Sequence, residues 1–330
     1  MPWATVGERV MRQRLFVTFD LPLQVCRILD ASFDVSYGAA QFQLQPDVAL
    51  DVLQGHSMIL VSATRDWLDA ALIARLPDCI RAITTYSVGH DHIDLQAARA
   101  RGIAVFSTPD VLSAACAEVG MLLLLGAARR VTESVDLLRS GNWQGWTPNQ
   151  LNGTGLSGKV LGIFGMGRIG REIASRARGF DMDIHYANRS RLPPDQEQSA
   201  TYHGTPESLL RVSQFLMLAC PATPETTGFL NAGTIDLLPP GAIIANIGRG
   251  AVVVDEDLVT ALVSGRIAAA GLDVFNNEPE IFPGYAALPN VFMLPHIGSS
   301  TMEARQAMGA IVVQGLTAFG QGQPTPNRIG

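Results

Sequence analysis

A glycine-rich turn in the middle of the chain limits its possible folds more than any other feature. The β-rich run at residues 159–164 is followed by Gly165-Met-Gly167-Arg-Ile-Gly170, and then by a helical pattern at 171–180. Gly165 permits a tight turn, Gly167 lets the backbone approach a phosphate closely, and Gly170 lets the helix pack against the strand. Because the first N–H groups of a helix attract anions, the motif predicts a pyrophosphate-binding turn rather than a purely structural one.

Short apolar runs rich in β-branched residues alternate with helical patterns on both sides of this turn, which indicates βαβ units and parallel sheets. Five strands are expected before it, at 15–18, 33–36, 58–62, 80–84 and 103–106. Six are expected from the motif onward, at 160–164, 184–187, 215–219, 242–246, 269–274 and 291–294.

A long apolar helix at residues 111–138 is expected to join the two strand series, and a last helix at 302–319 is expected to return to the first domain. The fold class is therefore α/β, with two doubly wound parallel-sheet domains. The first is a discontinuous, flavodoxin-like substrate-binding domain of residues 1–107 and 296–330. The second is a Rossmann, dinucleotide-binding domain of residues 108–295.

Composition excludes several other classes of protein. Charged residues make up only 16% of the 330 and hydrophobic residues 47%, so most of the chain should be packed. A net charge of −6 without a basic stripe disfavours nucleic-acid binding. No apolar run approaches the length of a membrane span, and no signal peptide is expected. Four scattered cysteines without CxxC spacing predict neither a disulfide framework nor a metal site, and favour a cytoplasmic location.

The loop after the second strand of the Rossmann series bears on the choice of cofactor. An acidic residue usually stands there and binds the ribose 2′-hydroxyl of NAD. This chain has Asn188, Arg189, Ser190 and Arg191 instead. A guanidinium can bind a 2′-phosphate with two bonds, so the loop predicts a preference for NADP(H), with NAD(H) still possible. A solvated basic turn is the alternative interpretation.

Three later strands are each followed by one ionisable residue: Arg249, Glu278 and His296. Reduction of a 2-oxo acid needs a cation for the carboxylate and a proton donor for the carbonyl oxygen. An arginine suits the first role, and a histidine backed by a carboxylate suits the second. Asp273 is expected to hold the carboxamide or the ring edge of the nicotinamide. Each residue alone could be a surface or capping residue, but all three at strand ends favour a catalytic site.

These motifs together resemble the D-isomer-specific 2-hydroxyacid dehydrogenases, and most closely the glyoxylate/hydroxypyruvate reductase branch. The resemblance rests on segments 87–94, 165–170, 220–226, 246–250, 271–279 and 295–299. It implies that Arg249 binds the substrate carboxylate and that His296 is the acid/base, with Glu278 favouring its protonated form.

Further contacts are implied by the same resemblance. Backbone amides of Val88 and Gly89 would bind the substrate carboxylate. Trp146 would reach the active site of a partner subunit in a homodimer, or else anchor its own loop. Cofactor contacts would be made by Arg168, Ile169, Cys220, Pro221, Thr226, Ile247 and Gly298.

The sequence therefore predicts an NADPH-preferring reductase that converts small 2-oxo acids, such as glyoxylate or hydroxypyruvate, into D-2-hydroxy acids. Phosphite and formate dehydrogenases share the fold but are disfavoured. The first carries a lysine at the position of Val88, and the second lacks the partner that Glu278 supplies. A nucleotide-sensing corepressor is the alternative from outside the enzymes.

Overall fold

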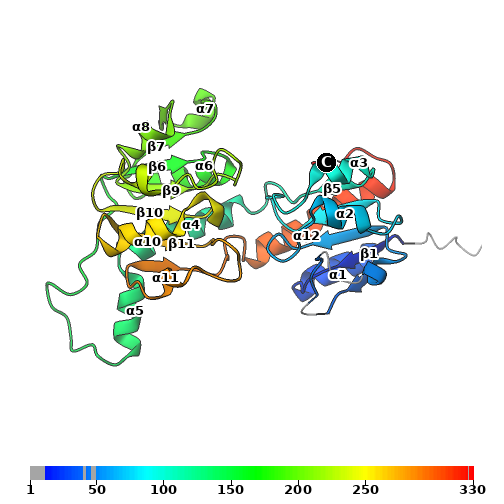
Figure 1. Ribbon diagram of the computed structural model, residues 1–330, viewed down its shortest axis with the longest axis horizontal. Helices are drawn as coiled ribbons and strands as arrows, with labels where there is room; N and C mark the ends of the chain where they lie inside the picture. Colours follow the sequence, from blue (N-terminus) through cyan, green and yellow to red (C-terminus); the bar gives the residue numbers. More distant parts are fainter. Residues whose placement is uncertain (1–11, 40–41, 46–49, 326) are drawn as a thin grey trace, which may run out of the picture. The chain divides into compact units, whose positions relative to one another are not determined.

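The computed structural model describes residues 12–39, 42–45, 50–325 and 327–330. The chain forms two compact units, one of residues Met1–Val111 with Thr301–Gly330, the other of Leu112–Ser300 (Figure 1). Both chain crossings lie a few residues later than the predicted boundaries at 107/108 and 295/296. The Thr108 amide bonds to the Ser87 carbonyl of unit 1 at 2.9 Å, and the Ile297 amide bonds to Asp273 of unit 2 at 2.8 Å.

Unit 1 contains a five-stranded parallel sheet in the order β2-β1-β3-β4-β5, as in flavodoxin-like folds. Its strands are β1 (Arg14–Val17), β2 (Asp34–Tyr37), β3 (Met58–Val61), β4 (Ala82–Thr85) and β5 (Ala104–Phe106). Its helices are α1 (Leu23–Ser32), η1 (Leu50–Leu53), α2 (Ala70–Arg75), α3 (Leu95–Ala100) and α12 (Met302–Gly320). The five strands expected from the sequence are confirmed within two residues at each end.

The last helix returns to unit 1, as the sequence predicted. Helix α12 packs against α1 so closely that a Cβ added at Gly309 would lie 2.8 Å from Cγ1 of Val25. After α12, the Ile329 amide bonds to the Val105 carbonyl of β5 at 2.8 Å. The core of unit 1 is therefore completed by the final thirty residues of the chain.

Unit 2 contains a seven-stranded parallel sheet in the order β12-β11-β10-β9-β6-β7-β8. Its strands are β6 (Val160–Phe164), β7 (Asp183–Ala187), β8 (Thr201–His203), β9 (Phe215–Leu218), β10 (Ala242–Asn246), β11 (Ile267–Leu272) and β12 (Val291–Met293). The prediction of six strands was wrong by one, because β8 is a three-residue edge strand that pairs only with β7. So short a run carries no readable alternation.

Helices cover this second sheet (Figure 1). They are α4 (Ser113–Ala128), α5 (Val131–Arg139), α6 (Arg168–Arg178), α7 (Pro194–Glu197), α8 (Pro206–Leu210), α9 (Ala232–Ile235), η2 (Gly250–Val252), α10 (Asp255–Val263) and α11 (Pro283–Ala286). The strand order is that of a Rossmann sheet with one added edge strand, so the predicted fold class is confirmed.

The single helix predicted at 111–138 was wrong, because α4 and α5 are separate. Arg130 lies between them in the left-handed region, with φ of 54°. Its guanidinium binds both oxygens of Glu133 at 2.7 Å, which fixes the start of α5. The Ala128 carbonyl at the end of α4 accepts a bond from the Thr154 amide at 2.8 Å. Helix α4 packs against β10 and β11, whereas α5 has no buried residue.

Candidate active site

The glycine turn lies between β6 and α6, where the sequence predicted it. Gly165 has φ of +102°, and a Cβ there would lie 2.6 Å from the Cys220 amide nitrogen. A Cβ at Gly170 would overlap the Gly165 carbonyl oxygen, whereas one at Gly167 would meet nothing within 4 Å. Helix α6 begins at Arg168, three residues earlier than predicted, and no side chain caps it.

These features fit a dinucleotide. The open side of Gly167 leaves room for a pyrophosphate, and the uncapped start of α6 points amide groups at that room. The two other glycines are needed for packing, because a side chain at either position would collide with backbone atoms. The turn therefore has both the space and the hydrogen-bond donors that the phosphates require.

Several predicted cofactor contacts surround this turn. The Thr226 hydroxyl donates to the Pro221 carbonyl at 2.7 Å and so closes the loop that begins at Cys220. Gly298 is buried, and a Cβ there would lie 3.2 Å from Cδ1 of Ile247. Ile169 is half-buried in the first turn of α6. Their contacts with a cofactor remain predictions.

In the loop after β7, some polar side chains form hydrogen bonds within the protein and others are exposed. Asn188 accepts a bond from the Met166 amide at 2.7 Å and thereby holds the glycine turn. Arg189 and Ser190 are exposed. Arg191, predicted to bind the cofactor, is held by the Glu197 carboxylate at 2.8 and 3.0 Å. No role was predicted for Glu197 from the sequence.

Arg249 follows β10 in a turn whose backbone is held by hydrogen bonds to the Asn246 side chain. Asn246 is almost fully buried. Its Oδ1 accepts from the Gly248 amide at 3.0 Å, and its Nδ2 donates to the Arg249 carbonyl at 2.9 Å. The side chain of Arg249 is half-buried, and its Nη1 donates to the Gly248 carbonyl at 3.0 Å. Asn246 is a positioning residue that sequence reasoning quoted but did not interpret.

Glu278 and His296 form the pair that the sequence predicted. Nδ1 of His296 lies 2.7 Å from Oε2 of Glu278, and the Phe275 amide donates to Oε1 of Glu278 at 2.9 Å. Burial alone would raise the pKa of Glu278, but the bond with His296, the Phe275 amide and the charge of Arg249 together lower it. The carboxylate is therefore ionised at neutral pH and orients the imidazole, whose Nε2 remains available for proton transfer.

Asp273 proves to be a fully buried anchor for the loop that carries His296. Its two carboxylate oxygens accept from the Ile297 and Gly298 amides, each at 2.8 Å. Burial raises the pKa of Asp273, although those amides and His296 act in the opposite direction. This anchoring was not foreseen, and the predicted contact of Asp273 with the nicotinamide remains a prediction. His296 itself has φ of 52°, a conformation that such an anchored loop can maintain.

Strand order explains why the three catalytic candidates meet. Arg249 follows β10, Glu278 follows β11 and His296 follows β12, and these strands are neighbours in the sheet. Parallel strands bring their carboxyl ends to one edge. Gly250 brings two of the loops still closer, because a Cβ there would overlap the backbone of Phe275.

Three further residues predicted to contact the substrate lie elsewhere in the chain. Val88 and Gly89 belong to unit 1. Within the described part of the chain, their amides have no hydrogen-bond partner, while the Ser87 hydroxyl holds the Gly89 carbonyl at 2.5 Å. Trp146 of unit 2 is 79% exposed, so it does not anchor its own loop. Their roles toward a substrate stay predictions.

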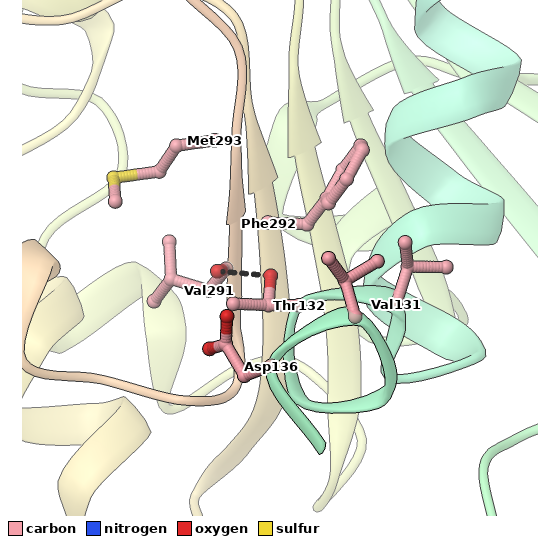
Figure 2. A pocket seen from close by; sticks show the side chains of 7 residues that line it. Val131, Thr132, Asp136, Val291, Phe292 and Met293 are labelled. Atoms are coloured by element: carbon pink, nitrogen blue, oxygen red, sulfur yellow. Dashed lines mark hydrogen bonds between the residues drawn. The ribbon is translucent and has the colours of Figure 1, made fainter. Parts of the chain in front are cut away.

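A hollow of about 220 Å³ lies between α5 and the edge strand β12, apart from the catalytic loops (Figure 2). The Thr132 hydroxyl of α5 donates to the Val291 carbonyl of β12 at 2.9 Å. The rest of its lining is largely apolar: Val131, Val135, Asp136, Phe292 and Met293. Among the described residues, no three metal-ligating side chains gather, and no helix is both long and apolar enough to cross a membrane.

A Rossmann sheet with a phosphate turn and a carboxylate–imidazole pair at neighbouring strand ends defines a nicotinamide-dependent oxidoreductase. Comparison with known proteins agrees. Residues 121–298 match the model of the D-isomer specific 2-hydroxyacid dehydrogenase, NAD binding domain. The chain belongs to this family, so a nicotinamide dinucleotide is its cofactor.

Named relatives cover almost the whole chain. Glycerate dehydrogenase from Hyphomicrobium methylovorum is 43% identical over 90% of this chain and 92% of its own length. Glyoxylate reductase from Thermococcus litoralis is 38% identical over 97% of both chains. The structure of an NADPH-dependent glyoxylate/hydroxypyruvate reductase from Sinorhizobium meliloti, in complex with NADP and malonate, has 32% identity and a TM-score of 0.86, and covers 97% of both chains. The predicted family and branch are confirmed.

Proposed function

We propose that this enzyme reduces small 2-oxo acids, such as glyoxylate or hydroxypyruvate, to D-2-hydroxy acids, with NADPH preferred over NADH. The observation that carries the proposal is the 2.7 Å pair of His296 and Glu278, close enough to Arg249 for its charge to lower the pKa of Glu278. A proton donor and a carboxylate-binding cation are the two groups that reduction of a 2-oxo acid demands.

The residues divide the chemistry as follows. When bound, the reduced nicotinamide supplies the hydride that the carbonyl carbon accepts. The Arg249 guanidinium holds the substrate carboxylate, with the Val88 and Gly89 amides as further donors. Protonated His296 gives its Nε2 proton to the carbonyl oxygen, which becomes the hydroxyl. Glu278 keeps Nδ1 occupied and stabilises the imidazolium before the transfer.

The cofactor preference rests on the loop after β7. Asn188 stands at the position where an acid would repel a 2′-phosphate, and Arg189, the next residue, is exposed. The Sinorhizobium reductase, 32% identical, is described as NADPH-dependent. A charge-assisted bond to phosphate is worth roughly 1.5–3 kcal/mol in general, and solvent and salt reduce it at an exposed site.

We also propose a cytoplasmic homodimer. Helix α5 has no buried residue, and Leu138 is 62% exposed at its end. Trp146 follows in a loop that extends from the sheet of unit 2 (Figure 1). A second copy that covered α5 and the hollow beside β12 would bury these side chains. The location rests on the four cysteines, which no disulfide joins.

The test is a panel of 2-oxo acids assayed with NADPH and with NADH, for wild type and His296→Asn. Glyoxylate or hydroxypyruvate should be reduced, and His296→Asn should lower kcat by about 10²-fold or more. Its affinity for NADPH, measured by fluorescence titration, should not change. If no 2-oxo acid is turned over while NADPH still binds, a nucleotide-sensing role replaces the proposal.

A further inference from the structure

Glu197 closes a ring of hydrogen bonds behind the cofactor loop. The residue is only 7% exposed, and its carboxylate accepts from the Tyr186 hydroxyl at 2.6 Å, and from Nε and Nη2 of Arg191 at 2.8 and 3.0 Å. The Tyr186 hydroxyl accepts in turn from the Leu192 amide at 3.0 Å. The ring joins strand β7, the loop after it and helix α7.

Charge holds this ring together at neutral pH. The Arg191 guanidinium, followed by the Tyr186 hydroxyl, lowers the pKa of Glu197, and the same carboxylate raises the pKa of Arg191. The guanidinium also lies 5.9 Å from the ring centroid of Tyr202 on β8. Two of its three nitrogens thus donate to the carboxylate, and its central carbon lies over an aromatic ring.

Arg189, two residues earlier, is in a different situation. It is exposed, and no hydrogen bond engages its side chain within the described residues. Glu225, whose pKa is lowered mainly by the Thr223 hydroxyl and to a smaller extent by Arg189, follows β9. Strand β6, which carries the glycine turn, lies between β7 and β9 in the sheet. Arg189 is thus close to the turn and has all its donors to offer, whereas Arg191 already donates to Glu197 through two nitrogens.

We propose that Glu197 determines cofactor specificity as a positioning residue. Its bonds to Arg191 make that side chain a strut, meaning a fixed support for the conformation of the loop after β7. Arg189, not Arg191, then binds the 2′-phosphate of NADPH. This rests on the proposed NADPH preference. Were a phosphate to take Arg191 from Glu197, it would break both bonds between the guanidinium and the carboxylate and leave Glu197 with the Tyr186 hydroxyl alone.

A rival reading makes Arg191 the phosphate ligand and Glu197 its competitor. The two readings predict opposite signs for Glu197→Gln. If Glu197 is the competitor, its neutralisation frees Arg191 and tightens NADPH. If Glu197 instead supports Arg191 as part of the loop, Glu197→Gln makes the loop more mobile. Arg189 is then positioned less well, and NADPH binds more weakly.

The experiment measures the dissociation constants of NADPH and NADH by fluorescence titration. Glu197→Gln and Arg191→Ala should each weaken NADPH roughly 3- to 10-fold and NADH less than about 2-fold, and the double variant should be no worse than the more affected single variant. Glu207→Gln, an exposed carboxylate on α8, is the matched control and should change neither constant. If Glu197→Gln folds poorly, Arg189→Ala still distinguishes the two interpretations: it should weaken NADPH binding more than Arg191→Ala does if Arg189 binds the phosphate, and less if Arg191 binds it.

Tighter NADPH binding by Glu197→Gln would overturn the inference, and so would equal weakening of both cofactors, which marks a merely structural role. Arg189→Ala separates this failure from failure of the proposed function. If Arg189→Ala weakens NADPH but neither ring variant does, only the strut is wrong. If wild type prefers NADH and Arg189→Ala changes nothing, the NADPH preference is wrong and the inference falls with it.

Discussion

Replacing Gly250 with alanine should separate the catalytic loops without touching a catalytic side chain. A Cβ added there overlaps the Phe275 backbone, and real Cβ atoms essentially never come within 3.0 Å of such an atom. Because both partners are backbone, no side-chain rotation can relieve the overlap, and one loop has to move by about 1 Å. The Phe275 amide holds Glu278, so the movement shifts that carboxylate relative to Arg249.

A misplacement of about 1 Å near the reacting groups costs roughly 10²-fold in rate, and the overpacking costs about 1–3 kcal/mol of stability. The assay is kcat/KM for glyoxylate, beside a thermal melt and a titration with NADPH. Gly250→Ala should lower kcat/KM about 10²-fold and leave cofactor affinity within about 2-fold. Gly204→Ala is the matched control, because a Cβ there meets nothing within 4 Å. Wild-type kcat/KM in a folded Gly250→Ala enzyme would refute the reasoning.

Three other variants test the remaining roles. Glu278→Gln should move the reductive pH optimum downward, because the imidazolium of His296 loses its counterion; an unchanged profile contradicts the pairing. The pKa of Glu278 is lowered from 4.5 in the folded protein, so the ionised carboxylate stabilises the fold above pH 4.5, and this stabilisation is lost as the pH falls below that value. The difference in Tm between wild type and Glu278→Gln should therefore shrink in acid. Arg249→Lys should raise KM for glyoxylate at least about 10-fold with NADPH affinity unchanged; parallel loss of cofactor binding would instead make Arg249 a cofactor residue. Trp146→Ala should lower activity only if a partner subunit uses this side chain, and light scattering that finds a fully active monomer would exclude the dimer.

Local chemistry explains how much of the site could be predicted. Gly165, Gly167 and Gly170 act through their spacing along one turn, so the sequence shows them directly. The meeting of Glu278 with His296 followed from a topological rule, because parallel strands end at one edge. That rule places residues at an edge but does not give their hydrogen bonds. The second role of Asp273, as an anchor for two amides, therefore appeared only in the structure.

The features that were missed depend on contacts without a sequence period. Arg191 and Glu197 are six residues apart across a loop, and nothing in the spacing shows that a nearly buried carboxylate faces the guanidinium. The break between α4 and α5 is another example. No glycine or proline interrupts residues 127–138, and the left-handed backbone at Arg130 lies where the two helices separate.

The late return of the chain to unit 1 has a consequence for biosynthesis. Val25 on α1 is made long before Gly309 on α12, the helix that covers it. At typical rates of translation the interval is roughly 15–60 s. During that time all of Leu112–Ser300 is completed. The dinucleotide-binding unit can therefore fold on the ribosome before the N-terminal unit has its last helix. Until α12 is made, an apolar face of the N-terminal unit stays exposed, and chaperones are suited to bind such a face.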